Sequence, residues 1–335
     1  MKKILNNPDA FCRETLEGII LAHSDKLKAL DEDLRIIVRN DKVKEGKVGI
    51  VTAGGSGHLP VFLGYVGQSM LDGCAVGNVF ASPSAKKMYH MISQCDKGNG
   101  VLCLYGNYGG DNMNFDMACE MADMEDINTM RIRVCDDIAS APKDKKEKRR
   151  GVAGMVFAWK IAGAAADKMM SLEEVAKVTN HALENIGTMG VALSPCIVPQ
   201  VGKPTFSIQD DEMEVGMGIH GEVGIEVCKM LTADEIVKML LDKICEDMEI
   251  KRDDEVAVMI NGLGATPLEE LYITYRAAHK YFEKRGVAIL TPYIGEFATS
   301  MEMAGMSVTV MKLDSVLKEL LEYPASTPFF INANR

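Results

Sequence analysis

The stretch Lys47-Val-Gly-Ile-Val-Thr52, followed at once by Ala53-Gly-Gly-Ser-Gly-His58, is where the fold can first be recognised in this sequence. Its first half is a short run of apolar and β-branched residues, which predicts a buried strand. Its second half is rich in glycine, which allows a backbone to turn sharply and to approach a ligand closely. The stretch therefore predicts a strand that ends in a glycine-rich loop.

The same pattern recurs further along the chain. A second apolar run at residues 101–105 leads into Gly106-Asn-Tyr-Gly-Gly-Asp111, and a third run at 130–134 ends at two aspartates. Amphipathic segments that predict helices follow these runs, at residues 114–124, 151–167 and 172–186. Ser171 is the expected N-cap of the last helix. Alternating strands and helices are typical of an α/β protein.

The texture of the sequence changes after Gly187-Thr-Met-Gly190, where a loop-rich passage with several prolines begins. Beyond it the alternation resumes, with expected strands at residues 213–219, 256–260, 287–293 and 307–312 and expected helices at 233–247 and 268–285. We therefore expect two α/β domains, each a sheet flanked by helices, at residues 1–187 and 188–335. A chain of 335 residues is long enough for two such domains.

Charge and cysteine content exclude several classes of protein. The chain has 37 Lys and Arg against 48 Asp and Glu, so its net charge of −11 disfavours binding to nucleic acid or to an anionic membrane. We expect the basic run at residues 143–150 to be a solvated loop or helix end. The nine cysteines form no Cys-x-x-Cys pair, and the N-terminus resembles no signal peptide, so we expect free thiols in the cytoplasm.

Three ionisable residues in glycine-rich loops are candidates for a site. Ligands of open α/β sheets bind beyond the carboxyl ends of strands, which is where His58 and Asp111 are expected, and His220 follows another expected strand. Each has a structural alternative: a histidine beside glycine can be a turn residue, and Asp111 can be the N-cap of the next helix.

Motifs for nucleotides and metals are weak or missing. The sequence has no Walker-type phosphate loop and no close spacing of metal ligands, so no metal site is expected. Gly216-Met-Gly-Ile-His-Gly221 matches the dinucleotide pattern G-x-G-x-x-G, but acidic residues surround it and no helix is expected to start there. We therefore do not interpret it as a dinucleotide site.

Seven motifs occur together in one order along the chain. They are Val51-Thr-Ala-Gly-Gly-Ser-Gly-His58, Val79-Phe-Ala-Ser-Pro83, Asn107-Tyr-Gly-Gly-Asp111 with Asn114-Phe115, Arg150-Gly-Val-Ala-Gly154, Lys203-Pro-Thr-Phe206, Gly216-Met-Gly-Ile-His-Gly-Glu222 and Asn261-Gly-Leu-Gly264. Together they resemble the dihydroxyacetone kinase family, specifically its DhaK-type substrate-binding subunit, over residues 10–330 or so. The resemblance implies two α/β domains, a homodimer and a ketone substrate held covalently on a histidine.

The resemblance also implies roles for individual residues. His220 would attack the carbonyl carbon of the ketone to give a hemiaminal, and Gly55-Ser56-Gly57 would cradle the substrate. His58 and Asp111 would bind the substrate hydroxyls and act in acid–base steps. No cofactor is expected on this chain: ADP or ATP with Mg²⁺ would be bound by a separate DhaL-type partner subunit, fed by a phosphotransferase-system protein or by free ATP.

The sequence departs from the family pattern at three places. The chain has His58-Leu59-Pro60 where Gly-His-Glu-Pro is usual, Asn78 where a glutamate is common, and Gly106 where a substrate-binding lysine is usual. The missing lysine leaves space for a longer ketose such as erythrulose. Three functions remain open: a dihydroxyacetone kinase subunit, an erythrulose kinase subunit, and a non-catalytic ketose sensor that co-activates a transcription regulator.

Overall fold

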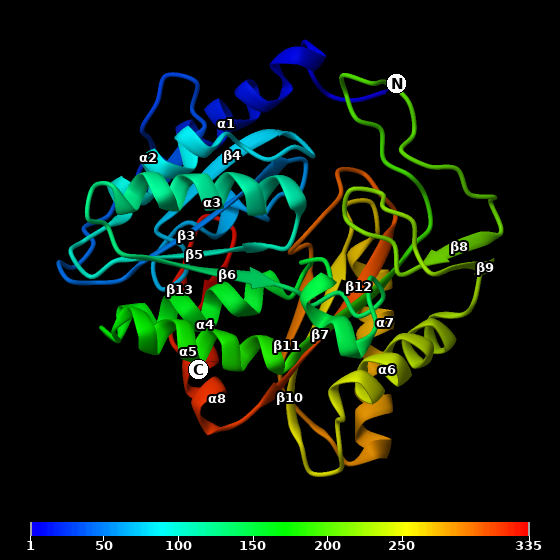
Figure 1. Ribbon diagram of the computed structural model, residues 1–335. Helices are drawn as coiled ribbons and strands as arrows, with labels where there is room; N and C mark the ends of the chain where they lie inside the picture. The colour runs from blue at the N-terminus through cyan, green and yellow to red at the C-terminus, as the bar shows by residue number, and fades with distance from the viewer. Residues whose placement is uncertain (1, 334–335) are drawn as a thin grey trace. The chain divides into compact units, whose positions relative to one another are not determined.

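The computed structural model describes residues 2–333 and separates into two compact units, coloured along the chain in Figure 1. The first unit consists of Met1–Val134, Val156–Ala182 and Leu317–Arg335, and the second of Cys135–Met155 and Leu183–Val316. The expected division was a single boundary between residues 187 and 188. The units are instead discontinuous in sequence, because residues 135–155 pack with the second half and the C-terminal segment returns to the first.

The first unit is built on a six-stranded sheet of order β1-β2-β4-β3-β5-β6. The strands are β1 (Leu27–Ala29), β2 (Ile36–Arg39), β3 (Gly49–Ser56), β4 (Gly73–Val79), β5 (Val101–Gly106) and β6 (Thr129–Val134). Strands β4, β3, β5 and β6 are parallel neighbours, whereas β1 and β2 pair antiparallel at one edge. The carboxyl ends of the four parallel strands therefore lie along one edge of the sheet.

Helices cover both faces of this sheet (Figure 1). The helical segments of the unit are η1 (Pro8–Ala10), α1 (Phe11–Ala22), η2 (Leu63–Tyr65), α2 (Ala85–Cys95), α3 (Gly109–Asp123), α4 (Met155–Asp167), α5 (Leu172–Glu184) and α8 (Ser315–Glu322), with a short hairpin of β13 (Ala325–Ser326) and β14 (Ile331–Asn332). Helices α2 and α3 pack on one face in a core that includes Met91, Cys103 and Phe115. On the other face, the indole of Trp159 in α4 donates a hydrogen bond to the carbonyl of Leu104.

The second unit contains a mixed sheet of order β11-β10-β12-β7-β8-β9. Its elements are η3 (Lys143–Lys148), β7 (Ile186–Ala192), β8 (Glu212–Val215), β9 (Glu226–Lys229), α6 (Ala233–Met248), β10 (Glu255–Gly262), α7 (Leu268–Arg285), β11 (Ala288–Gly295) and β12 (Gly305–Leu313). Only β10 and β11 are parallel; the other neighbours are antiparallel. Helices α6 and α7 pack on the sheet through a core that includes Leu240, Phe282 and Val308.

Most of the expected elements are confirmed. The α/β class, the strands near residues 50, 103, 132, 258, 290 and 309, and the helices α5, α6 and α7 all appear with bounds close to those expected. Ser171 does cap α5: its hydroxyl accepts from the Glu174 amide, and the Glu174 carboxylate accepts from the Ser171 amide. All nine cysteines are free thiols. Every helix among residues 2–333 is too short or too polar to cross a lipid bilayer.

Several expected boundaries differ from those of the structure. Helix α4 begins at Met155 rather than at residue 151, and β8 ends at Val215 rather than at 219. The Gly187–Gly190 segment, interpreted as a change of domain, lies inside β7. Its glycines are packing residues: a Cβ on Gly190 would stand 2.7 Å from the backbone oxygen of Met306 in the neighbouring strand.

A buried ionic cluster fixes the amino ends of β3 and β4 in the first unit. The carboxylate of Asp72 accepts hydrogen bonds from Lys47 Nζ (2.5 Å), Arg39 (3.0 Å) and the Ile50 amide (2.8 Å). Lys47 and Asp72 are only 2% and 3% exposed, so neither charge is hydrated. Because an unpaired buried charge is costly, the three groups depend on one another.

We predict that Asp72→Asn destabilises the protein by about 3–5 kcal/mol, because it removes the buried carboxylate that pairs with both Lys47 and Arg39. Chemical denaturation monitored by circular dichroism measures this loss. Asp41→Asn is the matched control, since Asp41 also pairs with Arg39 but its side chain is 48% exposed; its expected cost is about 0–1 kcal/mol. Equal losses in the two variants would contradict the role given to burial.

Candidate functional site

The loops that follow β4, β3 and β5 meet at the carboxyl edge of the first sheet. The segment Phe80–Pro83, just beyond β4, contacts the loop that follows β3 and the helix that follows β5. The ring of Phe80 stacks on His58, with centroids 4.8 Å apart, and the carbonyl of Pro83 accepts a hydrogen bond of 2.8 Å from Asn114 of α3. The expectation that the glycine-rich loops lie after neighbouring parallel strands is confirmed.

The glycines in these loops allow backbones to approach more closely than any side chain would permit. A Cβ on Gly54 would lie 2.0 Å from the ring of Phe62, and a Cβ on Gly55 would lie 2.7 Å from the amide nitrogen of Ala81. Gly57 has a φ of +101°, which only glycine adopts readily. Strand β3 continues to Ser56, whose hydroxyl donates to the carbonyl of Gly77. The loop is thus a rigid extension of the strand.

His58 is completely buried, at 0% exposure. Besides stacking on Phe80, its ring meets Phe62 edge to face at a centroid distance of 6.0 Å. Two aromatic rings therefore fix the plane of the imidazole. A turn residue that merely tolerates a left-handed backbone would be exposed and would have a positive φ, which His58 does not have; the turn alternative does not describe it.

Asp111 lies in the first turn of α3 and is also buried, at 7% exposure. The N-cap of this helix is Tyr108, so the alternative in which Asp111 caps the helix is wrong. Helix α3 begins at Gly109, five residues before the expected start, and this places Asp111 inside the helix. Burial and, to a smaller extent, the charge of Asp111 raise the pKa of the Cys74 thiol in β4.

In the second unit, His220 is held by the glutamate two residues beyond it. Nδ1 of His220 lies 2.9 Å from one carboxylate oxygen of Glu222, and the His220 amide donates to the other oxygen, also at 2.9 Å. Although burial raises the pKa of Glu222, the hydrogen bonds from His220 outweigh it and lower that pKa to about 2. Glu222 is therefore ionised at neutral pH and only accepts hydrogen bonds.

Arg150 anchors the loop that carries His220. Its guanidinium donates to the carboxylate of Asp137 and to the carbonyl of Gly216, at 2.8 and 2.9 Å. A Cβ on Gly218 would lie 2.1 Å from the Glu222 carboxylate and 2.6 Å from Arg150, so both charged groups occupy the space that this glycine leaves. Burial raises the pKa of Asp137 to about 6, with Arg150 opposing the rise.

The candidate residues thus form two groups. Gly55, Ser56, Gly57, His58 and Asp111 belong to the first unit, whereas His220 belongs to the second. Glu222 and Arg150 were quoted in motifs, but the sequence analysis gave them no role. The signal for Glu222 was its His-x-Glu spacing; Arg150 had none, because its partners are distant in sequence.

Two other motifs have structural explanations. Asn261 is fully buried at the end of β10, where its amide donates to Ala298 O and Ser307 Oγ and accepts from two backbone amides. The Gly216–Gly221 segment is a turn with no helix directly after it, which confirms the expectation that no helix starts there. Within residues 2–333, no group of three His, Cys, Asp or Glu side chains could hold a metal ion.

The structure thus defines an α/β protein with a buried histidine after a tight glycine-rich loop, a buried aspartate in the next helix and, in the other unit, a second histidine held by a carboxylate. Residues 17–329 match the Dak1 domain, and the chain belongs to that family.

Relatives and solved structures resemble the chain over almost its whole length. It is 43% identical to the dihydroxyacetone-binding subunit DhaK of the PTS-dependent dihydroxyacetone kinase 1 of Listeria innocua, over 98% of this chain and 99% of that one. It is 38% identical to the L-erythrulose kinase of Pectobacterium atrosepticum, covering 98% of this chain but 56% of that enzyme. The structure of the dihydroxyacetone kinase operon co-activator Dha-DhaQ superimposes with a TM-score of 0.90 at 31% identity, covering 96% of this chain and 98% of that one.

We predict that Arg150→Lys loosens the loop at residues 216–222, because an ammonium lacks the fork that holds Asp137 and the Gly216 carbonyl together. Amide hydrogen exchange in this loop should accelerate at least about tenfold, while the global free energy of unfolding changes little. Arg131→Lys, which affects an exposed pair with Asp116, is the control. If amide exchange in the loop is unchanged in Arg150→Lys, the loop keeps its conformation without the hydrogen bonds from Arg150.

Proposed function

We propose that this protein is the ketose-binding subunit of a dihydroxyacetone kinase, in which a partner subunit phosphorylates a ketone held covalently on His220. The observation that carries the proposal is the His220–Glu222 pair. Support comes from the 43% identity to the Listeria subunit over nearly the full length of both chains.

The pair prepares the imidazole for attack on a carbonyl. An ionised Glu222 accepts a hydrogen bond from Nδ1–H, which leaves the lone pair of the neutral ring on Nε2. This nitrogen forms the bond to the carbonyl carbon, the π electrons move to the oxygen, and the oxygen takes a proton. The positive charge left on the ring then lies beside the Glu222 carboxylate, which stabilises it.

Selection of a ketone follows from this chemistry. A triose has too little apolar surface for contacts alone to distinguish it from glycerol, but only a carbonyl can add to an imidazole. Gly55-Ser56-Gly57 surround the substrate, and His58 stabilises the hemiaminal oxygen. Asp111 accepts the proton of the hydroxyl that attacks phosphorus.

The phosphoryl donor belongs to the partner. We propose a DhaL-type subunit that holds ADP or ATP with Mg²⁺, and a homodimer of the present chain. In support, this chain covers only 56% of the L-erythrulose kinase from Pectobacterium, so that enzyme contains a further region of comparable size. Whether the donor is recharged by a phosphotransferase-system protein or by free ATP depends on the partner.

A four-carbon ketose is a second candidate substrate. Gly106 ends β5 without the lysine that is usual in the family, and the chain is 38% identical to an L-erythrulose kinase. A co-activator role is a third candidate, suggested by the likeness to Dha-DhaQ. Buried Asp111 favours a kinase over a co-activator, because a ketose sensor needs the covalent histidine but no base.

We predict that native mass spectrometry of the protein with dihydroxyacetone shows a reversible adduct of one ketose, and that His220→Ala abolishes it. The same variant should raise the Michaelis constant for the ketose, because it removes the covalent anchor. His279→Ala, at an exposed position of α7, is the control and should keep the adduct. Full occupancy in His220→Ala would overturn the covalent mechanism.

We predict a different result for Asp111→Asn, which keeps a side chain of similar size but cannot accept the proton. Partner-coupled phosphoryl transfer should fall by roughly 10²–10⁴, the range for one general base, while the adduct on His220 still forms. The matched control is Asp116→Asn on the exposed side of the same helix. If Asp111→Asn lowers the melting temperature but leaves turnover normal, Asp111 is a structural residue.

A further inference from the structure

The basic run at residues 143–150 is the most strongly cationic segment of an otherwise acidic chain, with six Lys or Arg and two acidic residues. In the structure its first residue and its last two are committed to ion pairs: Lys143 with Glu249, Arg149 with Asp247 and Arg150 with Asp137. The three lysines between them, Lys145, Lys146 and Lys148, are exposed and form no ion pair with any described residue. The segment therefore presents three exposed lysines that are not committed to ion pairs.

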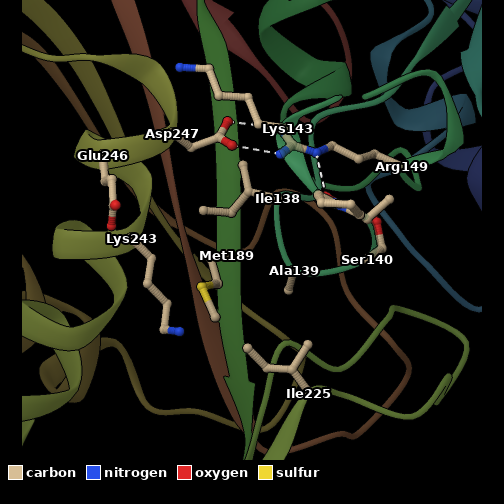
Figure 2. A pocket seen from close by; sticks show the side chains of 12 residues that line it. Ile138, Ala139, Ser140, Lys143, Arg149, Met189, Ile225, Lys243, Glu246 and Asp247 are labelled. Atoms are coloured by element: carbon tan, nitrogen blue, oxygen red, sulfur yellow. Dashed lines mark hydrogen bonds and ion pairs between the residues drawn. The ribbon is translucent and has the colours of Figure 1, made fainter. Parts of the chain in front are cut away.

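A groove of about 500 Å³ adjoins this segment, as Figure 2 shows. Its apolar lining includes Ile138, Met189 of β7 and Ile225. Its polar lining includes Lys143 and, from α6, Lys243, Glu246 and Asp247, the last of which is paired with Arg149. The groove can thus receive an apolar side chain beside charges of both signs, and the excess of positive charge lies in the adjoining lysines.

The groove and the basic segment are joined to the loop that carries His220. Gly216, at the start of that loop, packs between Ala139 and Ile225, both of which line the groove. The last residue of the basic run, Arg150, donates to the Gly216 carbonyl. A molecule bound here would lie on the same unit as His220, the residue proposed to hold the substrate.

We propose that the groove and Lys145, Lys146 and Lys148 form the docking surface for the phosphoryl-donating partner, which contributes an acidic segment with an apolar anchor. This inference rests on the function proposed above and names the place where its partner binds. Charge complementarity favours this occupant, because the basic surface attracts an acidic segment and the groove accepts an apolar side chain. The net charge of the chain is −11, so an acidic partner would be repelled if it approached another face. The same net charge disfavours a nucleic acid as the occupant.

The test is a charge reversal, Lys145→Glu with Lys146→Glu and Lys148→Glu, assayed with the nucleotide-binding partner subunit from the same organism, loaded with ADP or ATP. The control reverses Lys251, Lys280 and Lys284, three exposed lysines elsewhere in the second unit, so that the net charge changes equally. Ile225→Ala, which shortens a half-exposed side chain in the groove, tests the apolar contact separately. The ketose adduct on His220 is measured in every variant.

We expect the basic-run variant to raise the Michaelis constant for the partner at least about tenfold at low salt, with kcat at saturating partner within about twofold. Raising the ionic strength to about 0.5 M should bring the wild type and the variant together, because salt screens exposed charges. Ile225→Ala should weaken binding of the partner at both salt concentrations. The lysine control should behave as the wild type.

Two failures are distinguishable. If the wild type forms the adduct and transfers phosphate, but the basic-run variant is no weaker than the lysine control, the docking surface is elsewhere and the proposed function stands. If the wild type forms no adduct and no partner supports transfer, the proposed function itself fails. Binding of single-stranded DNA that is lost in the basic-run variant, with unchanged partner kinetics, would overturn the choice of occupant.

Discussion

Close approach of backbone to backbone at the carboxyl ends of β3 and β4 is the constraint on which the first unit's site depends. A Cβ on Gly77 would lie 1.8 Å from the carbonyl oxygen of Ala81, and the ring of Phe62 occupies the space that a Cβ on Gly54 would need. These contacts restrict the backbone of the segment beyond β4, so that Phe80 stacks on the ring of His58. Any side chain larger than hydrogen at these glycines would separate the strands from the loops that position the candidate site residues.

The second unit orients its histidine by charge rather than by close packing alone. Glu222 orients the imidazole, Gly218 leaves room for that carboxylate beside Arg150, and Arg150 ties the loop to Asp137. Each group acts through the next, and only the first touches His220. This arrangement explains how a glycine-rich loop, flexible by composition, can hold the imidazole of His220 in one orientation: hydrogen bonds to Glu222 within the loop and from Arg150 outside it remove the flexibility.

Several features that were missed share one physical cause. Strands β4 and β7 contain two glycines each, which lowers their intrinsic tendency to form strands. In the folded chain a Cβ at these positions would meet a close neighbour: backbone of a loop or strand at Gly77 and Gly190, and side chains of α2 and α6 at Gly73 and Gly187. Local propensity and tertiary packing therefore give opposite answers at Gly187 and Gly190, and packing prevails. The discontinuous units have a similar origin, since no local pattern indicates that residues 135–155 pack with a sheet formed much later in the chain.

The sequence by itself determined the α/β class, the order of most strands and helices, the ordered set of motifs and the candidates His58, Asp111 and His220. It could do so because apolar periodicity and glycine-rich strand ends are local properties. The tertiary structure alone decided that Asp111 lies inside a helix rather than at its cap, that Glu222 and Arg150 hold the His220 loop, and that Asp72 pairs with two buried cations. Those facts depend on which side chains exclude water together, and residues far apart in sequence decide that only when the chain has folded.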